Sequence, residues 1–280
     1  AKKKIDDINF IAGHFIKINH FDWARYCADN ALNMAIAIDY TLGIADANNN
    51  LGMISYETDE HEDAIGKFLK ASKLYNSLNE FSKEAEVYSY LGISYRYIDD
   101  YSAMIDVLFK ALYLFRDNSD ENKEGNVLNS IGNYYLEIRQ EELALEYYDM
   151  TLKMKRKQMQ VDGCIRVLFN KGLIYFNLKK YEKSLKFYYE AQNFNEKIER
   201  SPLYKIRILQ NIASVYREIN KYEEAEKIYF ECIDYYDKNK NLTDKCDSMQ
   251  ALAALYSSME KREAALKLFG EAEALAKKLN

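Results

Sequence analysis

The stretch Tyr90-Leu91-Gly92-Ile93-Ser94-Tyr95, followed by Tyr101, Met104, Leu108 and Ala111, has a pattern that returns along the whole sequence. A small residue, Gly or Ala, which we call the anchor, occurs at positions 12, 52, 92, 132, 172, 213 and 253, so five of the six steps are 40 residues and one is 41. An aromatic residue follows three positions after the anchor in six of the seven copies, and Ser55 is the exception. The sequence therefore predicts an array of one repeated unit.

The spacing inside the unit predicts two antiparallel helices. The anchor and the aromatic residue three positions later share one face of a first helix. In the second helix, residues 12, 16 and 19 positions after the anchor also share a face, and in most copies they are small, large and small. Small residues let two helices approach closely and large residues fill the space beside them, so the two faces fit together.

This pattern resembles the tetratricopeptide repeat (TPR), whose consensus has Leu-Gly, Tyr, Ala, Phe or Tyr, and Ala at these offsets. The usual repeat has about 34 residues, and the 40-residue form is similar to the long repeats of bacterial peptide-pheromone receptors and kinesin light chains. The resemblance implies an all-α, right-handed superhelical solenoid of about seven repeats that forms a single domain over residues 1–280. The predicted repeats cover 1–42, 43–82, 83–122, 123–162, 163–202, 203–242 and 243–280.

Polar turns are expected between the helices. Within the pairs, Asn and Asp at positions such as Asn19, Asp59 and Asp99 suit a tight turn because they tolerate left-handed backbone angles. Longer polar joins are expected between the pairs. One of them ends in Ser201-Pro202, which is expected to cap and begin the first helix of the sixth repeat.

Composition narrows the classes of function. A net charge of −5 with 30% charged residues indicates a mildly acidic surface, which argues against binding to nucleic acid or to an anionic membrane. No apolar run approaches the roughly 20 residues that span a bilayer. Four cysteines without paired spacing, Cys27, Cys164, Cys232 and Cys246, are expected to be buried or half-buried free thiols in a reducing cytoplasm.

The sequence shows no constellation typical of catalysis. It has no Gly-rich phosphate loop, no Cys-x-x-Cys pair and no His-Glu-x-x-His motif. Its three histidines, His14, His20 and His61, are scattered. Neighbouring carboxylates such as Glu141 and Glu142 fall at turns or outer faces. We expect no catalytic residue, no metal site and no cofactor.

Function is expected on the inner, concave face, which the first helices line in stacked repeats of this kind. Side chains that leave the core there lie 6, 3 and 2 positions before the anchor and 1, 4 and 5 after it. The predicted peptide-binding residues are Asn49, Asn50, Tyr90, Arg96, Tyr97, Asn129, Asn133, Arg166, Phe169, Asn170, Gln210, Asn211 and Arg217.

The chemistry of these residues suits a peptide. An amide side chain both donates and accepts, so it can bond both edges of an extended backbone. Arginine can hold a carboxylate, and the aromatic residues can form side-chain pockets. The TPR carboxylate clamp of Lys-Asn-Asn-Lys-Arg is incomplete here, so capture of an acidic C-terminal tail is not expected. The alternative interpretation is that Asn fills this face only because it is small and polar in an Asn- and Lys-rich chain.

Two functions remain open. One is a peptide- or protein-binding sensor or regulatory module of a bacterial signalling protein. The other is a structural scaffold that assembles a complex through its outer surface or its ends. The last helix keeps Leu266 and Phe269 on an apolar stripe without a solvating helix after it. We therefore expect its end to lead into a fused effector domain or a homodimer contact.

Overall fold

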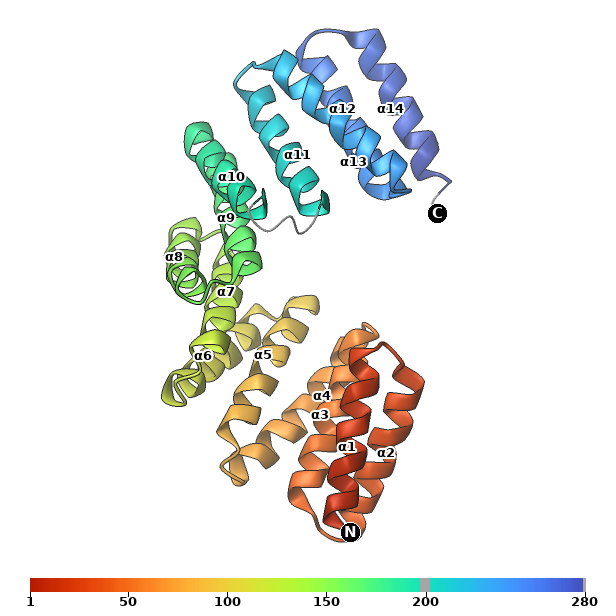
Figure 1. The fold of residues 1–280 in the computed structure, drawn as a ribbon, viewed down its shortest axis with the longest axis vertical. Coiled ribbons are helices and arrows are strands. Elements are labelled where there is room, and N and C mark those ends of the chain that lie inside the picture. Colours follow the sequence, from red (N-terminus) through yellow and green to blue (C-terminus); the bar gives the residue numbers. More distant parts are fainter. Residues whose placement is uncertain (197–201, 279–280) are drawn as a thin grey trace. The chain divides into compact units, whose positions relative to one another are not determined.

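The structure, a computed structural model, describes residues 1–196 and 202–278, and every regular element in these ranges is an α-helix (Figure 1). The helices are α1 (Lys2–Lys17), α2 (Phe21–Ala37), α3 (Thr41–Glu57), α4 (His61–Ser77), α5 (Phe81–Tyr97), α6 (Tyr101–Asp117), α7 (Glu121–Glu137), α8 (Glu141–Lys157), α9 (Val161–Asn177), α10 (Tyr181–Glu196), α11 (Pro202–Glu218), α12 (Tyr222–Lys238), α13 (Leu242–Ser258) and α14 (Arg262–Ala276). The predicted all-α array of helix pairs is confirmed. Within the described ranges, no helix combines the length and the apolar character needed to cross a membrane.

The chain forms two compact units, Ala1–Met154 and Lys155–Asn280, and the division falls inside α8. Unit 1 contains α1 to α7 and most of α8. Unit 2 contains the last residues of α8 and the helices from α9 to α14. Each unit is a run of antiparallel helix pairs. The single domain over residues 1–280 stays a prediction.

Where the structure describes the join between two neighbouring helices, it is a three-residue turn with one recurring geometry. After α3, Asp59 has a φ of 60°, its N–H donates to the Tyr56 carbonyl at 3.3 Å, and the Glu60 N–H donates to the Ser55 carbonyl at 2.8 Å. This is the Schellman arrangement, which satisfies carbonyls that a helix end leaves unpaired. Left-handed residues occupy the turns at Asn19, Asp39, Asp59, Asn79, Asp99, Ser119, Arg139, Met159, Lys179, Asn220, Lys240 and Glu260.

These turns correct one expectation and qualify another. The joins between pairs in the described ranges have the same three residues as the turns within pairs, because the next helix also runs antiparallel and starts beside the last one. Asn and Asp fill only half of the left-handed positions, so side-chain preference does not alone place the turns. The helix α11 begins at Pro202 as predicted, while Ser201 lies outside the described residues.

The anchor glycines mark the closest approach of the two helices in a pair. A Cβ atom built on Gly92 would lie 2.6 Å from Leu108 Cδ2, and one built on Gly172 would lie 2.5 Å from Tyr188 Cε1. Each of these partners lies 16 positions after its anchor and is fully buried. The predicted pairing of a small anchor with a large residue of the second helix is therefore confirmed. A side chain added at one of these glycines would have to push the second helix away.

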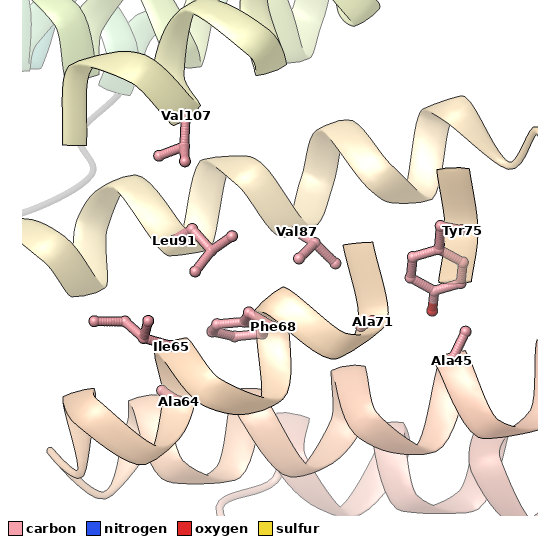
Figure 2. Close-up of a cluster of buried hydrophobic side chains, with 9 residues drawn as sticks. All are labelled: Ala45, Ala64, Ile65, Phe68, Ala71, Tyr75, Val87, Leu91 and Val107. Atoms are coloured by element: carbon pink, nitrogen blue, oxygen red, sulfur yellow. The ribbon is translucent and has the colours of Figure 1, made fainter. Parts of the chain in front are cut away.

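Second helices also carry the contact to the next pair. Figure 2 shows Phe68 of α4 between Ala64 and Ala71, with Leu91 and Val87 of α5 above it. Phe68 and Leu91 are completely buried. A fully buried side chain of this size contributes about 1.5–3 kcal/mol relative to an exposed one. The same residue thus holds its own pair together and attaches the next one.

The aromatic residues three positions after the anchors are half-buried rather than central to the core. Tyr135 stacks on Tyr147 with ring centroids 5.3 Å apart, and Tyr175 stacks on Phe187 at the same distance. The fully buried tyrosines lie instead on second helices, as Tyr75, Tyr148, Tyr188, Tyr229 and Tyr236. Tyrosine is therefore a packing residue here, as predicted, but its deepest positions are on the other helix of each pair.

The thiols follow their expectation, and the last helix has exposed apolar residues. All four cysteines are free, with Cys27 half-buried and the other three buried. On α14, Leu266 is 72% exposed and Phe269 is 42% exposed, whereas Tyr229, the equivalent of Phe269 one repeat earlier, is completely buried. Phe269 is exposed because no further helix within the described residues covers this face.

Candidate binding site on the first helices

The first helices of unit 1, which are α1, α3, α5 and α7, form a surface that we call the first-helix face of that unit. It carries two pockets, each of about 330 Å³. This volume is at the lower end of the range for ligand pockets. We call them the α1–α3 pocket and the α5–α7 pocket after the helices that supply most of their linings.

The α1–α3 pocket is polar. It is lined by Asp6, Asn9, Phe10, Gly13, His14, Lys17, Asp46, Asn49, Asn50 and Lys83. Asp46 accepts from the Lys83 ammonium and from the Tyr75 hydroxyl, both at 2.7 Å. Asn50 Nδ2 donates to the Asn9 carbonyl at 2.9 Å. These bonds connect three neighbouring helix pairs and fix the shape of the pocket wall.

The α5–α7 pocket has apolar walls and a polar rim. Its lining residues are Glu86, Ser89, Tyr90, Ile93, Phe115, Lys123, Asn126, Val127 and Ser130. Phe115 and Val127 are almost completely buried, so the core supports these walls. Tyr90 is held by stacking on Phe68 at 5.8 Å and by an edge contact with Tyr56 at 5.7 Å. The pocket is therefore preformed rather than opened by a ligand.

A row of ion pairs links neighbouring first helices. Asp46 pairs with Lys83 in unit 1, Glu86 pairs with Lys123 at 2.5 Å, and Arg207 pairs with Asp244 at 3.6 Å in unit 2. In these three pairs the partners are 37 residues apart, because a residue six positions before one anchor meets a residue nine positions before the next. Sequence reasoning missed Lys83 and Lys123. The recurrent spacing of opposite charges by 37 residues was the signal that could have found them.

Protonation states support this arrangement. Burial, and then the nearby Asp46 carboxylate, raise the pKa of Tyr75, so its hydroxyl stays a donor. Burial also raises the pKa of Tyr90. The hydrogen bond to Glu86 is the main reason that the pKa of Lys123 is raised. At neutral pH the pocket walls thus contain neutral tyrosines and a paired ammonium group.

Five of the predicted residues lie on α3 and α5. Asn49 and Asn50 line the α1–α3 pocket, and Tyr90 lines the α5–α7 pocket. Arg96 and Tyr97 are exposed at the end of α5 and line neither pocket. Arg96 pairs with Glu137 at 2.6 Å, and Tyr97 stacks on His61 with ring centroids 4.1 Å apart.

The two predicted asparagines of α7 have different environments. Asn133 Oδ1 accepts a hydrogen bond from the Tyr148 hydroxyl at 2.6 Å, so this side chain holds α7 and α8 together. Asn129 is half-buried, and its Oδ1 atom is covered without a hydrogen-bond donor among the described residues. Asn133 therefore has a structural contact, and Asn129 lines neither of the two pockets.

The remaining predicted residues belong to unit 2, on α9 and α11. They are Arg166, Phe169, Asn170, Gln210, Asn211 and Arg217. Arg166 is exposed, while the other five are half-buried. Phe169 packs against Tyr188 at 5.7 Å, Asn211 Nδ2 donates to the Arg207 carbonyl at 2.8 Å, and Arg217 pairs with Glu218 at 2.9 Å. The structure brings them onto the first helices of one unit.

The arrangement offers hydrogen bonds and apolar contact rather than reaction chemistry. Ser89 and Ser130 donate to carbonyls of their own helices, which leaves their oxygen lone pairs available on the pocket rim. Among residues 1–196 and 202–278, no group of three or more His, Cys, Asp and Glu is placed to hold a metal ion. The face can accept N–H groups and enclose a side chain.

Comparison with known proteins shows what this geometry is similar to. The family model described as tetratricopeptide repeat matches residues 164–238. No curated protein matches the sequence significantly. Among solved structures, the STAND protein PH0952 from Pyrococcus horikoshii, which has a tetratricopeptide repeat sensor, is similar with a TM-score of 0.81 and 19% identity, covering 98% of this chain and 42% of that one.

Two structures of NprR are also similar. The apo form of this quorum sensor from B. thuringiensis has a TM-score of 0.65 and 16% identity, covering 96% of this chain and 87% of that one. NprR in complex with its cognate peptide NprX has a TM-score of 0.62 and 17% identity, covering 94% and 75%. Together with the period of 40 residues, these matches show that the chain has a fold of the tetratricopeptide-repeat type, with a family match over residues 164–238.

Proposed function

We propose that this chain is a non-catalytic module that binds an extended peptide or protein segment on its first-helix face, as the sensor or regulatory part of a cytoplasmic bacterial signalling protein. The observation that carries the proposal is the pair of preformed pockets in unit 1, which include Asn49, Asn50 and Tyr90. Support for a regulatory role comes from NprR, a quorum sensor solved with its peptide, and from PH0952, described as having a repeat sensor.

Preformed pockets favour binding because little conformational entropy is lost when the ligand arrives. The ion pairs and the Asn50–Asn9 bond already hold the polar pocket. Asn49 is half-buried in the lining of the same pocket, so its side-chain amide can contact a ligand there. The remaining predicted residues of unit 1 are proposed as further contacts along this segment, and those of unit 2 as peptide contacts on the first helices of that unit.

Titration with a peptide pool tests the proposal. Fluorescently labelled random decapeptides are titrated into the full chain, and binding is followed by anisotropy. The double variant Asn49→Ala with Ser89→Ala should weaken binding about tenfold, because each lost bond to the ligand contributes about 0.5–1.5 kcal/mol. Tyr113→Ala, on the second helix α6, serves as the control and should bind like the unchanged chain.

A scaffold that uses the outer surface is the second candidate, and one observation favours it. Grooves of about 370 Å³ and 300 Å³ flank α6 and share Phe109 and Tyr113 in their linings. Phe109 is 41% exposed, Tyr113 is 70% exposed, and Met150 of α8 is 46% exposed. If the peptide pool or a partner protein loses affinity with Tyr113→Ala and not with the double variant, the outer surface is the binding site.

The proposed output is through α14, to a fused effector domain or a second copy of the chain. The exposed Leu266 and Phe269 support an apolar contact there. Mass measurement of the chain at high concentration tests the dimer, which should dissociate when Leu266→Asp is introduced. A monomer at every concentration contradicts it.

A further inference from the structure

The two pockets of unit 1 differ in chemistry although they lie on one face. Charged and amide side chains dominate the α1–α3 pocket. In the α5–α7 pocket, the walls are the apolar surfaces of Tyr90, Ile93, Phe115 and Val127. A ligand that lies across both must present a different side chain to each.

We infer that the α5–α7 pocket selects one uncharged, apolar side chain of an extended peptide, of the size of Leu, Met or Phe, while the α1–α3 pocket takes a polar residue of the same peptide. This inference rests on the proposed function and specifies its ligand. The volume of about 330 Å³ is roughly twice that of an engineered apolar cavity that holds benzene, so such a side chain fits with space for its backbone.

The α5–α7 pocket is expected to exclude charged ligand side chains because the charges at its rim are already paired. Lys123 contacts the Glu86 carboxylate, lies 3.3 Å from Asp120, and has its ammonium 5.8 Å from the centre of the Phe115 ring. The two charges that line the pocket therefore already satisfy each other. A charged ligand side chain would lose its hydration without gaining a free counter-ion, and this is unfavourable.

The two pockets belong to different repeats of the same face, and Lys83 at the start of α5 lines the first of them. One extended segment can therefore present a different side chain to each pocket. Ser89 and Ser130, at the rim, offer acceptor oxygens to backbone N–H groups of the segment.

A positional-scanning library of capped decapeptides tests the inference on the full chain. We expect one position to favour Leu, Met, Ile or Phe, and replacement of that residue by Ala to weaken binding about 10- to 100-fold. Ile93→Phe makes the pocket smaller and should shift that position toward Ala and Val, while other positions keep their preferences. Ile93→Val makes it larger and should shift the position toward Phe.

Ile36→Phe is the matched control, because Ile36 is an exposed isoleucine on the second helix α2. It should leave every preference unchanged. The inference is overturned if peptides bind and depend on Asn49, yet no position favours apolar residues or Ile93→Phe and Ile93→Val leave the preferences as they were. Binding that depends on Tyr113 and not on Asn49 overturns the proposed function itself. Thermal melts of each variant confirm that the chain is folded.

Discussion

The first-helix faces of the two units differ in the order of their charges. In unit 1, the acids Asp46 and Glu86 lie six positions before their anchors, and lysines of the next repeat pair with them. In unit 2, the same position is occupied by Arg166 and Arg207, and Asp244 supplies the acid. One backbone geometry thus accepts either polarity, because the pair requires only opposite charges 37 residues apart. The fold therefore does not determine the sign of the charge six positions before the anchor, and this sign can differ with the ligand.

The largest expected effect comes from filling an anchor. Gly92→Val in unit 1 and Gly172→Val in unit 2 should each lower the free energy of unfolding by about 3 kcal/mol, because Leu108 and the Tyr188 ring lie too close to a new side chain. Urea unfolding measures the loss. Hydrogen exchange should then show reduced protection mainly in the unit that carries the substitution.

Two glycines serve as matched controls for this prediction. Gly66 in unit 1 and Gly270 in unit 2 have nothing within 4 Å of a built Cβ atom. Substitution by Ala should stabilise each helix by about 0.5–1 kcal/mol. If Gly92→Val and Gly172→Val reduce protection equally over the whole chain, the two units unfold as one and the comparison between them fails.

Alkaline pH should destabilise unit 2 through α12. Burial raises the pKa of the Cys232 thiol from 9.0 to about 12, and that of Tyr236 from 10.0 to about 12. The folded state favours the protonated forms, so this stability is complete below pH 9 for the thiol and below pH 10 for the phenol. It is lost as the pH rises toward 12, at about 1.4 kcal/mol per pH unit for each group.

Urea unfolding at pH 8, 9, 10 and 11 checks this slope. Cys232→Ala should flatten the decrease between pH 9 and 10, since the unfolded chain then has one thiol fewer to ionise. An unchanged slope in that variant would show that Cys232 does not control the alkaline loss.

Two tyrosines at equivalent positions of the two units give a further test of the comparison, with a smaller expected change in the free energy of unfolding. Tyr75 and Tyr236 lie 23 positions after their anchors and are both buried. The Tyr75 hydroxyl donates to Asp46 at 2.7 Å, whereas the Tyr236 hydroxyl makes no hydrogen bond of normal geometry among the described residues, although the Arg207 side chain lies near it. Tyr75→Phe should cost about 1 kcal/mol and Tyr236→Phe should be close to neutral, as measured by urea unfolding. Equal costs would contradict the assigned bonding.

The smallest effect is expected for the exposed pair of Arg96 and Glu137, at 2.6 Å. Arg96→Ala should change the free energy of unfolding by less than about 0.5 kcal/mol, because exposed ion pairs contribute little in water. A melt in low and high salt measures this difference. A loss above 1 kcal/mol would mean that this pair belongs to the connected network of the face.

The sequence alone predicted the helix pairs because anchors and their partners repeat at fixed positions. It also predicted that Asn49, Asn50 and Tyr90 would lie on one face, and the structure places them at two pockets. It did not show that the Asn133 side chain accepts a hydrogen bond from Tyr148, or that Lys123 lies at the rim of an apolar pocket. Those contacts depend on the offset between neighbouring helices, which periodicity within one helix does not contain.

The shared turn has a consequence for how such a chain can grow. Because one three-residue link serves both within and between pairs, the elementary insertion is a single helix of twenty residues. Removing forty residues, such as 81–120, would keep every later helix on its original side. Removing only twenty would exchange the two sides downstream and present core residues to water. Length changes in relatives should therefore come in even numbers of helices.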